Sequence, residues 1–260
     1  TIQQGQVYLG DWSGWAPGSL TVSNANVRLL CPGGVTIAGD VTVRNSSVLG
    51  VGGNAPYYGN PAFYHPLTES ATPALAVGGD LILSNLAALE LFAGEAGATL
   101  DVGGSMVVGY GCTNRLYCHP VSGGAPLLRV RDLDVNAGGA LDASAFGYCG
   151  IVQSNSVWYG LGPGGTRRGA GSHGGVGGRI NTSYPAGEVY GCSNAPVQAG
   201  SSGANDTTSG YAGGGVVRVE ARPISCAGAI RADGYYRVAN TMHFGSGGSV
   251  YLRCRHFTGT

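Results

Sequence analysis

Three aspartates are the best candidates in the sequence for carrying out a reaction. Asp132 and Asp134 lie two residues apart in the segment RVRDLDVN, beside Arg129 and Arg131, and Asp142 follows in the next segment. Residues two apart on a β-strand point to the same face, so the first two aspartates can act together. Because glycoside hydrolysis needs two carboxylates about 5–9.5 Å apart, a polysaccharide-cleaving site would lie here. The simpler interpretation, which we favour, is outward polar alternation on a half-buried strand.

A second candidate is the glycine-rich stretch GLGPGGTRRGAGSHGGVGG, residues 160–178. Phosphate-binding loops of the P-loop type need a lysine, and the chain contains none, so that kind of nucleotide site is excluded. A dinucleotide site also needs a helix next, which the following residues do not predict. His173 in GSHGG echoes a pectin-degrading motif but is more typical of a loop. We therefore expect no catalytic residue, metal or cofactor; a polysaccharide-degrading β-helix enzyme stays open as an alternative.

The spacing of glycines in this stretch bears on how its backbone packs. Gly162, Gly165, Gly171, Gly174 and Gly177 fall in one three-residue register. Glycine at every third residue lets extended chains pack closely, because it turns a residue without a side chain toward each neighbour. Two interpretations stay open: an extended segment pressed against other strands, and a flexible loop.

Composition narrows the classes of function. Of the 260 residues, 43% are hydrophobic, enough for a continuous core, whereas only 11% are charged, against about 25% in an average globular protein. The formal net charge is zero, which does not fit the basic surface that nucleic acid requires. No apolar run approaches the roughly 20 residues of a membrane span. We therefore expect neither nucleic-acid binding nor membrane insertion.

The chain has seven cysteines, and none forms the CxxC pair typical of zinc sites. Spread along a chain of low charge, they indicate an oxidising compartment with disulfides. Cys112 and Cys118 bracket the short segment TNRLY and form the first expected bridge. Cys31 is the odd cysteine, left over or bonded to a neighbouring chain. The other expected bridges are Cys226–Cys254 and Cys149–Cys192.

Three glycosylation sequons point to the same surroundings. Asn45, Asn181 and Asn205 each begin an Asn-x-Ser/Thr motif. Asn181 and Asn205 lie in irregular segments that the glycosylation machinery reaches readily, so we expect sugar there first. The chain begins TIQQG, which is typical of a processed product or a piece of a longer protein. We therefore expect an extracellular or cell-surface protein.

Short segments with alternating apolar residues recur along the chain and predict β-strands; no segment shows helical periodicity. In VTIAGDVTV, LAVGGDLIL and LDVGGSMVV, a corner of small residues or aspartate separates two apolar-x-apolar units. Ile37, Val77 and Val102 take the same place in this pattern, 40 and 25 residues apart. Rungs of a solenoid at about 20–30 residues explain the shorter spacing, and an inserted loop explains the longer one.

The repeated corners predict an all-β fold: a parallel β-helix, or β-solenoid, with long glycine-rich loops. Stacked rungs would bury their inward Val, Leu and Ile side chains together. A β-sandwich is the alternative, since turn signals every 8–12 residues also occur. We expect one solenoid domain over 1–260, with regular rungs in 1–145, a glycine-rich decorated region in 146–215 and C-terminal rungs in 216–260.

The C-terminal half resembles a known kind of repeat. The segments GAGSHGGVGG, SGYAGGGVVRVEARPISCAGAIRADGYY and FGSGGSVYLRC lie within residues 160–254. They are similar to the glycine-rich β-solenoid cassettes of very large secreted or surface proteins of protists and bacteria. The earlier rungs are similar, more loosely, to β-helical adhesin passengers. The resemblance implies an extracellular structural or adhesive role and supplies no catalytic residues.

The function we predict is that of an extracellular structural protein, a repeating subunit of a filament, surface appendage or sheath. Strand-like segments at both ends, TIQQGQVYLG and GSVYLRCRHF, would leave unpaired edges, which favours head-to-tail self-association. An adhesin or glycan-binding module of a larger surface protein is the alternative. Aromatic clusters in 55–66, 157–160 and 233–238 suit either glycan stacking or contacts between subunits.

Overall fold

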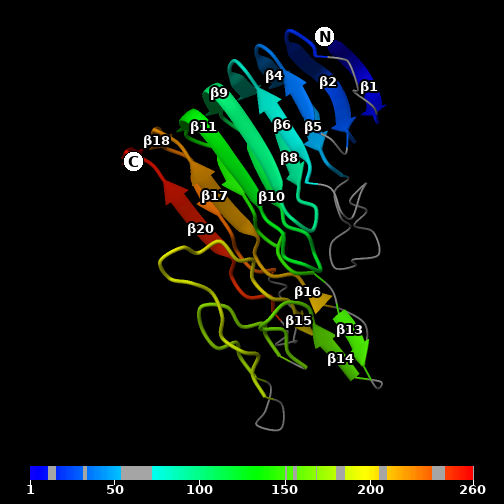
Figure 1. The fold of residues 1–260 in the computed structure, drawn as a ribbon, viewed down its shortest axis with the longest axis vertical. Helices are drawn as coiled ribbons and strands as arrows, with labels where there is room; N and C mark the ends of the chain where they lie inside the picture. Colours follow the sequence, from blue (N-terminus) through cyan, green and yellow to red (C-terminus); the bar gives the residue numbers. More distant parts are fainter. Residues whose placement is uncertain are drawn as a thin grey trace.

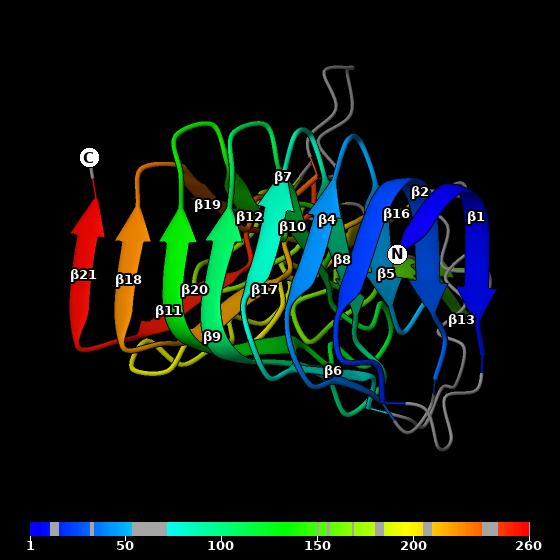
Figure 2. The same cartoon turned by 90° about the horizontal axis from the view of Figure 1, so that it is seen from above.

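Seventeen of the described strands form one large sheet that winds around an axis, with the two termini at opposite ends of the stack (Figure 1). Seen from above, successive turns of chain lie beside one another like the turns of a coil (Figure 2). The described residues contain no helix. The structure, a computed structural model, describes residues 1–10, 16–31, 34–53, 72–149, 151–154, 157–167, 169–179, 185–204, 210–235 and 244–259.

The strands are short, and most span one side of one turn. They are β1 (Ile2–Leu9), β2 (Leu20–Leu29), β3 (Val35–Ile37), β4 (Val41–Arg44), β5 (Val48–Val51), β6 (Ala74–Val77), β7 (Leu81–Ser84), β8 (Ala88–Phe92), β9 (Ala98–Val108), β10 (Thr113–Tyr117), β11 (Pro126–Val135), β12 (Ala140–Asp142), β13 (Ile151–Ser154), β14 (Val157–Gly160), β15 (Gly203–Ala204), β16 (Gly210–Tyr211), β17 (Val216–Glu220), β18 (Pro223–Cys226), β19 (Ala229–Arg231), β20 (Ser249–Arg253) and β21 (His256–Gly259).

Each turn of the coil, or rung, has three sides. β3, β6, β17 and β20 lie on the first side, β4, β7, β18 and β21 on the second, and β5, β8, β10, β12 and β19 on the third. The long strands β9 and β11 bend from the first side to the second, and β1 and β2 bend from the second to the third. Every pairing between rungs is parallel, so the predicted parallel solenoid is confirmed and the antiparallel sandwich is not found.

Equivalent residues of successive rungs lie beside one another in columns. Ile37 pairs with Val77, and Val77 pairs with Val102, as the repeated corners predict. Inward positions alternate with outward ones along each strand, and the inward columns form one continuous core. Burying such a side chain contributes about 1.5–3 kcal/mol. The largest fully buried side chains of the inner columns include Ile37, Leu49, Leu75, Leu81, Leu83, Leu89, Leu100, Met106 and Leu116.

Aspartates fasten the corner between the first and second sides. Asp40 Oδ1 accepts a hydrogen bond from the Asp80 amide at 2.8 Å. Asp80 Oδ1 in turn accepts one from the Ser105 amide at 2.7 Å. Each carboxylate therefore satisfies a backbone donor of the next rung, at the point where the chain turns and the ladder of backbone bonds is interrupted.

Asparagines fasten the corner between the second and third sides. Asn45 donates from Nδ2 to Ser23 Oγ at 2.9 Å, and Asn85 donates from Nδ2 to Asn45 Oδ1 at 3.2 Å. Asn45 and Asn85 have φ values of 59° and 53°, in the left-handed region that asparagine tolerates better than most residues. The same residue type thus makes the turn and links three rungs.

A column of charged residues runs along the outside of the third side. Arg28, Gly50, Glu90, Arg115 and Asp142 stand in register on β2, β5, β8, β10 and β12. Arg28 reaches across Gly50 to bond Glu90, and Arg115 bonds Glu90 from the opposite side at 2.9 Å. The Glu90 side chain is only 5% exposed, so two guanidiniums neutralise one buried carboxylate. Removing one partner of a buried ion pair costs about 3–5 kcal/mol, so this contact holds the rungs together.

An aromatic column lies beside these charges. Phe92 stacks on Tyr117 with ring centroids 4.3 Å apart, and Tyr117 packs on Phe146 at 4.0 Å. The Arg28 Cζ atom lies 6.0 Å from the centroid of the Phe92 ring. The guanidinium therefore has both a carboxylate and an aromatic face around it.

The chain leaves the coil after β12 and rejoins it at β17, which pairs with β11. Between them, extended glycine-rich segments and the antiparallel pairs β13–β14 and β15–β16 lie together at one side of the coil (Figure 1). At Gly165, Gly171 and Gly177, backbone carbonyls of nearby residues leave no room for a Cβ. Gly174 faces open space, and Gly162 has a φ of 93°. Close packing of extended chain is thus confirmed for three of the five glycines in the predicted register.

The crossing of Arg28 over Gly50 makes a sharp test of the fold. A Cβ at residue 50 would lie 2.7 Å from Arg28 Cδ and would collide with the guanidinium, forcing Arg28 away from Glu90. We expect Gly50→Ala to lower the free energy of unfolding by about 2 kcal/mol or more. Gly18→Ala is the control, because a Cβ there meets nothing within 4 Å. Urea unfolding followed by circular dichroism measures both, and equal stabilities would contradict the packing described.

Candidate functional site

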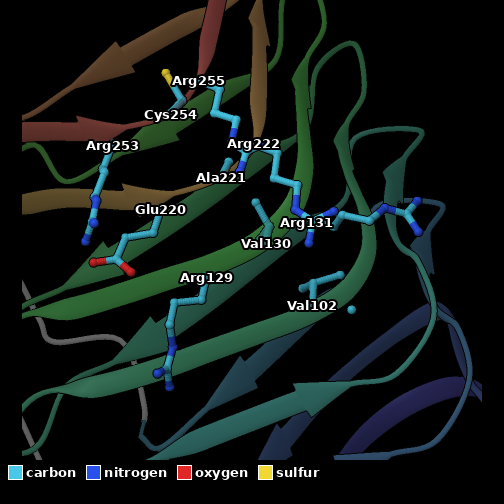
Figure 3. Close-up of a pocket in the computed structure, with 11 residues that line it drawn as sticks. Val102, Arg129, Val130, Arg131, Glu220, Ala221, Arg222, Arg253, Cys254 and Arg255 are labelled. Atoms are coloured by element: carbon cyan, nitrogen blue, oxygen red, sulfur yellow. The ribbon is translucent and has the colours of Figure 1, made fainter.

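An arginine-lined groove crosses the corner between the first and second sides near the C-terminal end of the coil (Figure 3). The groove is open to solvent, and its volume is about 630 Å³. Val130, Ala221 and Cys254, which pack against the core, form its floor, and Gly103 also lines it. Longer polar side chains, mostly arginines, project on either side of these residues.

Three residue triplets from successive rungs build the groove. In each, an apolar middle residue turns toward the core while its two polar neighbours point outward. This is the alternation of a strand, carried around the corner of the coil. The triplets are Arg129-Val130-Arg131, Glu220-Ala221-Arg222 and Arg253-Cys254-Arg255.

Backbone register places the triplets side by side. On the first side, Arg129 pairs with Glu220, and Glu220 with Arg253. At the corner itself, the Arg222 amide donates to the Arg131 carbonyl at 2.9 Å, and the Arg255 amide donates to the Arg222 carbonyl at 2.8 Å. The groove therefore has two walls, each one residue wide and three rungs long.

The wall on the first side alternates in charge. Arg129 pairs with Asp101 of the preceding rung, with Nε 2.6 Å from Oδ1. Glu220 follows, 3.7 Å from the Arg218 guanidinium, and Arg253 completes the wall. Opposite charges in adjacent positions of a sheet stabilise each other, so this wall is largely neutralised within the protein.

The wall on the second side consists of three arginines. Arg131 Nε bonds Asp132 Oδ2 at 2.8 Å, and this carboxylate raises the pKa of the Arg131 guanidinium above its ordinary value. Arg222 and Arg255 are exposed and form no ion pair with any residue that the structure describes. Two guanidiniums of this wall are therefore available to an anion from solution.

The three candidate carboxylates do not assemble into one site. Asp132 and Asp134 occupy outward positions of β11, flanking the buried Leu133, as simple alternation predicts. Asp132 is bonded to Arg131. Asp142 lies on the third side, on β12, where it accepts a hydrogen bond from the Ser144 amide at 2.9 Å.

His173 lies in the packed glycine-rich region. Its Nδ1 is 2.9 Å from the Gly247 carbonyl oxygen, and its ring packs on Tyr190 with centroids 4.8 Å apart. These contacts give the histidine a role in joining two segments. Of the aromatic clusters, 55–66 lies outside the described residues, as does the second half of 233–238.

No disulfide links any of the cysteines in the structure, in contrast to the predicted bridges. Cys112 and Cys118 lie at opposite ends of the extended strand β10, which separates their Cα atoms by about 20 Å, whereas a bridge tolerates about 7 Å. The predicted Cys112–Cys118 loop is therefore incompatible with this fold. For the second predicted bridge, the register places Gly259, not Cys254, beside Cys226.

The sequons divide between described and undescribed parts of the chain. Asn181 and Asn205 lie outside the described residues. Asn45 uses its side-chain amide in the asparagine column, and Ser47 of the same sequon is fully buried and accepts a hydrogen bond from the Ala25 amide. A sugar on Asn45 would displace these contacts.

Sequence reasoning did not identify the arginine groove. In the sequence, Arg129 and Arg131 stand out only as neighbours of the candidate aspartates. The three polar-apolar-Arg triplets are visible in the sequence as RVR, EAR and RCR. Their alignment depends on the pairing of β11 with β17 across the glycine-rich region, which nothing in the sequence indicates.

No family model, curated protein or solved structure matches the chain. Within the described part of the chain, no group of three or more His, Cys, Asp or Glu side chains is arranged to hold a metal ion. Nor does that part contain a helix long and apolar enough to cross a membrane. The architecture and the groove are therefore the observations on which function is argued.

The buried Cys118 thiol offers a test of packing where the glycine-rich region meets the coil. Burial raises the pKa of Cys118 to about 12, whereas Cys192 is exposed. At pH 8 we expect a thiol reagent to label Cys192 quickly and Cys118 only on unfolding.

The raised pKa of Cys118 also predicts how stability depends on pH. The thiol of the unfolded chain ionises near pH 9, which favours the unfolded state above that pH. The free energy of unfolding is therefore unaffected by this group below pH 9 and falls as the pH rises toward 12. Cys118→Ala should reduce that fall; equal labelling of both thiols at pH 8 would contradict this packing.

Proposed function

We propose that the chain is a structural subunit of an extracellular filament, surface appendage or sheath, in which solenoids stack end to end. The observation that carries the proposal is the open state of the core at both ends of the coil. The rungs at the two ends expose side chains that belong to inward columns, so each end offers apolar surface and unpaired backbone together.

At the C-terminal end the core is left uncovered. Phe257 pairs with Ile224, which pairs with the buried Leu133, so Phe257 continues an inward column. It is nevertheless 54% exposed, because no described strand lies beyond β21. Leu252 ends a neighbouring inward column in the same way.

At the N-terminal end β1 pairs only with β2 among the described strands. Val7 and Leu9 stand in register with the buried Val27 and Leu29 and are only partly covered. β1 contains no charged residue and no proline, the features with which proteins usually protect an exposed edge. The edge is therefore open to another parallel strand.

The two ends are complementary in outline. β1 covers the second and third sides of its rung, whereas β20 and β21 cover the first and second sides of theirs. A second copy with its β1 over β21 and β19 would continue both the backbone ladder and the inward columns. Because the two contacting surfaces differ, each subunit keeps one free end, and such a contact builds an open filament.

Extracellular placement is supported by three features of the sequence. Two of them are the resemblance to glycine-rich solenoid cassettes of secreted and surface proteins and the sequons, and the third is the low share of charged residues, 11%; the seven cysteines add no support, since no disulfide joins them in the structure. A module of a larger adhesin stays the alternative. In that case the open ends would contact flanking segments of the same chain instead of a second copy.

Replacing one backbone donor of the open edge tests end-to-end stacking. The Leu9 carbonyl accepts a bond from the Leu30 amide at 2.8 Å, so Leu9 faces β2 and the alternate residue Tyr8 presents its N–H to the open edge. We expect Tyr8→Pro to abolish concentration-dependent association, because it removes that donor and leaves the bonds to β2 in place. Sedimentation velocity over a range of concentrations measures this.

Tyr8→Thr is the matched control, since it removes the same aromatic side chain but keeps the amide donor. It should associate like the unaltered chain or somewhat more weakly. The stacking proposal fails if the unaltered chain sediments as a monomer at every concentration, or if Tyr8→Pro associates as well as Tyr8→Thr.

A further inference from the structure

The arginine wall of the groove departs from the pattern of the other charged columns on this coil. Along the first side, Asp101, Arg129, Glu220 and Arg253 alternate in sign from rung to rung. Along the third side, Glu90, Arg115, Asp142 and Arg231 alternate as well. In these columns each charge lies beside an opposite charge, which is the favourable arrangement in a sheet.

Arg131, Arg222 and Arg255 break that alternation. Neighbouring strands lie about 4.8 Å apart, so the three arginine side chains start from adjacent positions of one column. Like charges directly opposite each other destabilise a sheet, and among the residues that the structure describes only Arg131 of the three has a carboxylate of its own, Asp132. An external anion along this wall would remove the repulsion, so the column costs stability in the absence of a ligand and gains it on binding.

The shape of the groove selects a linear ligand. The wall runs along the axis of the coil, perpendicular to the strands, and Gly103, Val130 and Ala221 also line the open groove beside it. The planar guanidinium fork matches carboxylate and sulfate groups, which accept two parallel hydrogen bonds from it. A chain molecule that carries such groups at regular intervals can engage the three arginines together.

The lining also distinguishes between kinds of polyanion. No aromatic side chain lines the groove within the described residues, so bases of a single-stranded nucleic acid would find nothing on which to stack. Glu220, in the middle of the opposite wall, repels every anionic group but accepts hydrogen bonds from hydroxyl groups, so it favours a ligand whose anionic groups lie on one edge only. Hydroxyls on one edge and acidic groups on the other are the features of an acidic sugar chain.

We propose that the groove binds a linear acidic polysaccharide, whose carboxylate or sulfate groups lie on Arg131, Arg222 and Arg255 and whose hydroxyls face Glu220. This proposal does not require end-to-end stacking, because the arginine side chains point outward from the corner of the coil, although the last triplet, Arg253-Cys254-Arg255, belongs to the C-terminal rung.

Calorimetric titration of the whole chain at low salt tests the proposal with four probes. A galacturonate oligosaccharide supplies carboxylates, a heparin oligosaccharide supplies sulfates, dextran is the neutral sugar, and oligo(dT) is the nucleic acid. We expect saturable binding of at least one acidic sugar, weakened by added salt, with no binding of dextran and weaker binding of oligo(dT). The carboxylated and sulfated probes decide which acidic group is preferred.

The double variant Arg222→Gln/Arg255→Gln should weaken binding of the acidic sugar about ten-fold or more, since it removes two charged contacts. The matched control is Arg44→Gln/Arg179→Gln, which makes the same change of net charge at two exposed arginines outside the groove. It should bind within about two-fold of the unaltered chain. Circular dichroism should show that both variants keep the fold, because all four side chains are exposed.

Three outcomes would overturn the proposal. The first is no binding of either acidic sugar at low salt. The second is an equal loss of affinity in the groove variant and its control, which would indicate attraction by net charge alone. The third is tighter binding of oligo(dT) than of both sugars, which would assign the groove to nucleic acid.

Discussion

The fold depends on one constraint: parallel strands of successive rungs must stay in register at the spacing of a β-sheet. Once β3, β6 and β9 are in register, every side chain has a counterpart of the next rung beside it. Apolar counterparts then form the core, and aspartate and asparagine at the corners bond backbone or side chains of their neighbours. A charged residue on the outside must lie beside either an opposite charge or a like charge of the next rung. The stability of the coil and the character of its outer surface therefore have the same origin.

This constraint explains which parts of the structure the sequence could predict. The corners that follow Ile37, Val77 and Val102 lie close together in the chain and repeat a recognisable pattern, so the rungs and their parallel stacking follow from periodicity alone. The arginine groove joins Arg131 to Arg222 across the glycine-rich region, and its residues have no shared local pattern that would set the register. A repeated local pattern predicts which residues of consecutive rungs are neighbours. The groove depends instead on the pairing of β11 with β17, which are separated in the chain by the glycine-rich region.

The cysteine prediction failed for a related reason. Proximity in sequence does not mean proximity in space here, because Cys112 and Cys118 are separated by an extended strand, which is the longest path that five residues can make. In a coil, residues close in space are those one rung apart. The register places Gly259 beside Cys226, five positions away from Cys254, so even a correct assignment of rungs does not suffice without the register of each side.

The contact of Arg28 with Glu90 across Gly50 has a consequence for how the coil responds to force. If tension is applied to the N-terminal strand, a coil held only by neighbouring backbone bonds would peel one turn at a time. Here Arg28 of β2 bonds Glu90 of β8, and the strand β5 lies between these two strands. Detaching β2 from the coil therefore requires breaking an ion pair to a strand two rungs away. The first turns should therefore rupture as one mechanical unit, at a higher force than the turns behind them.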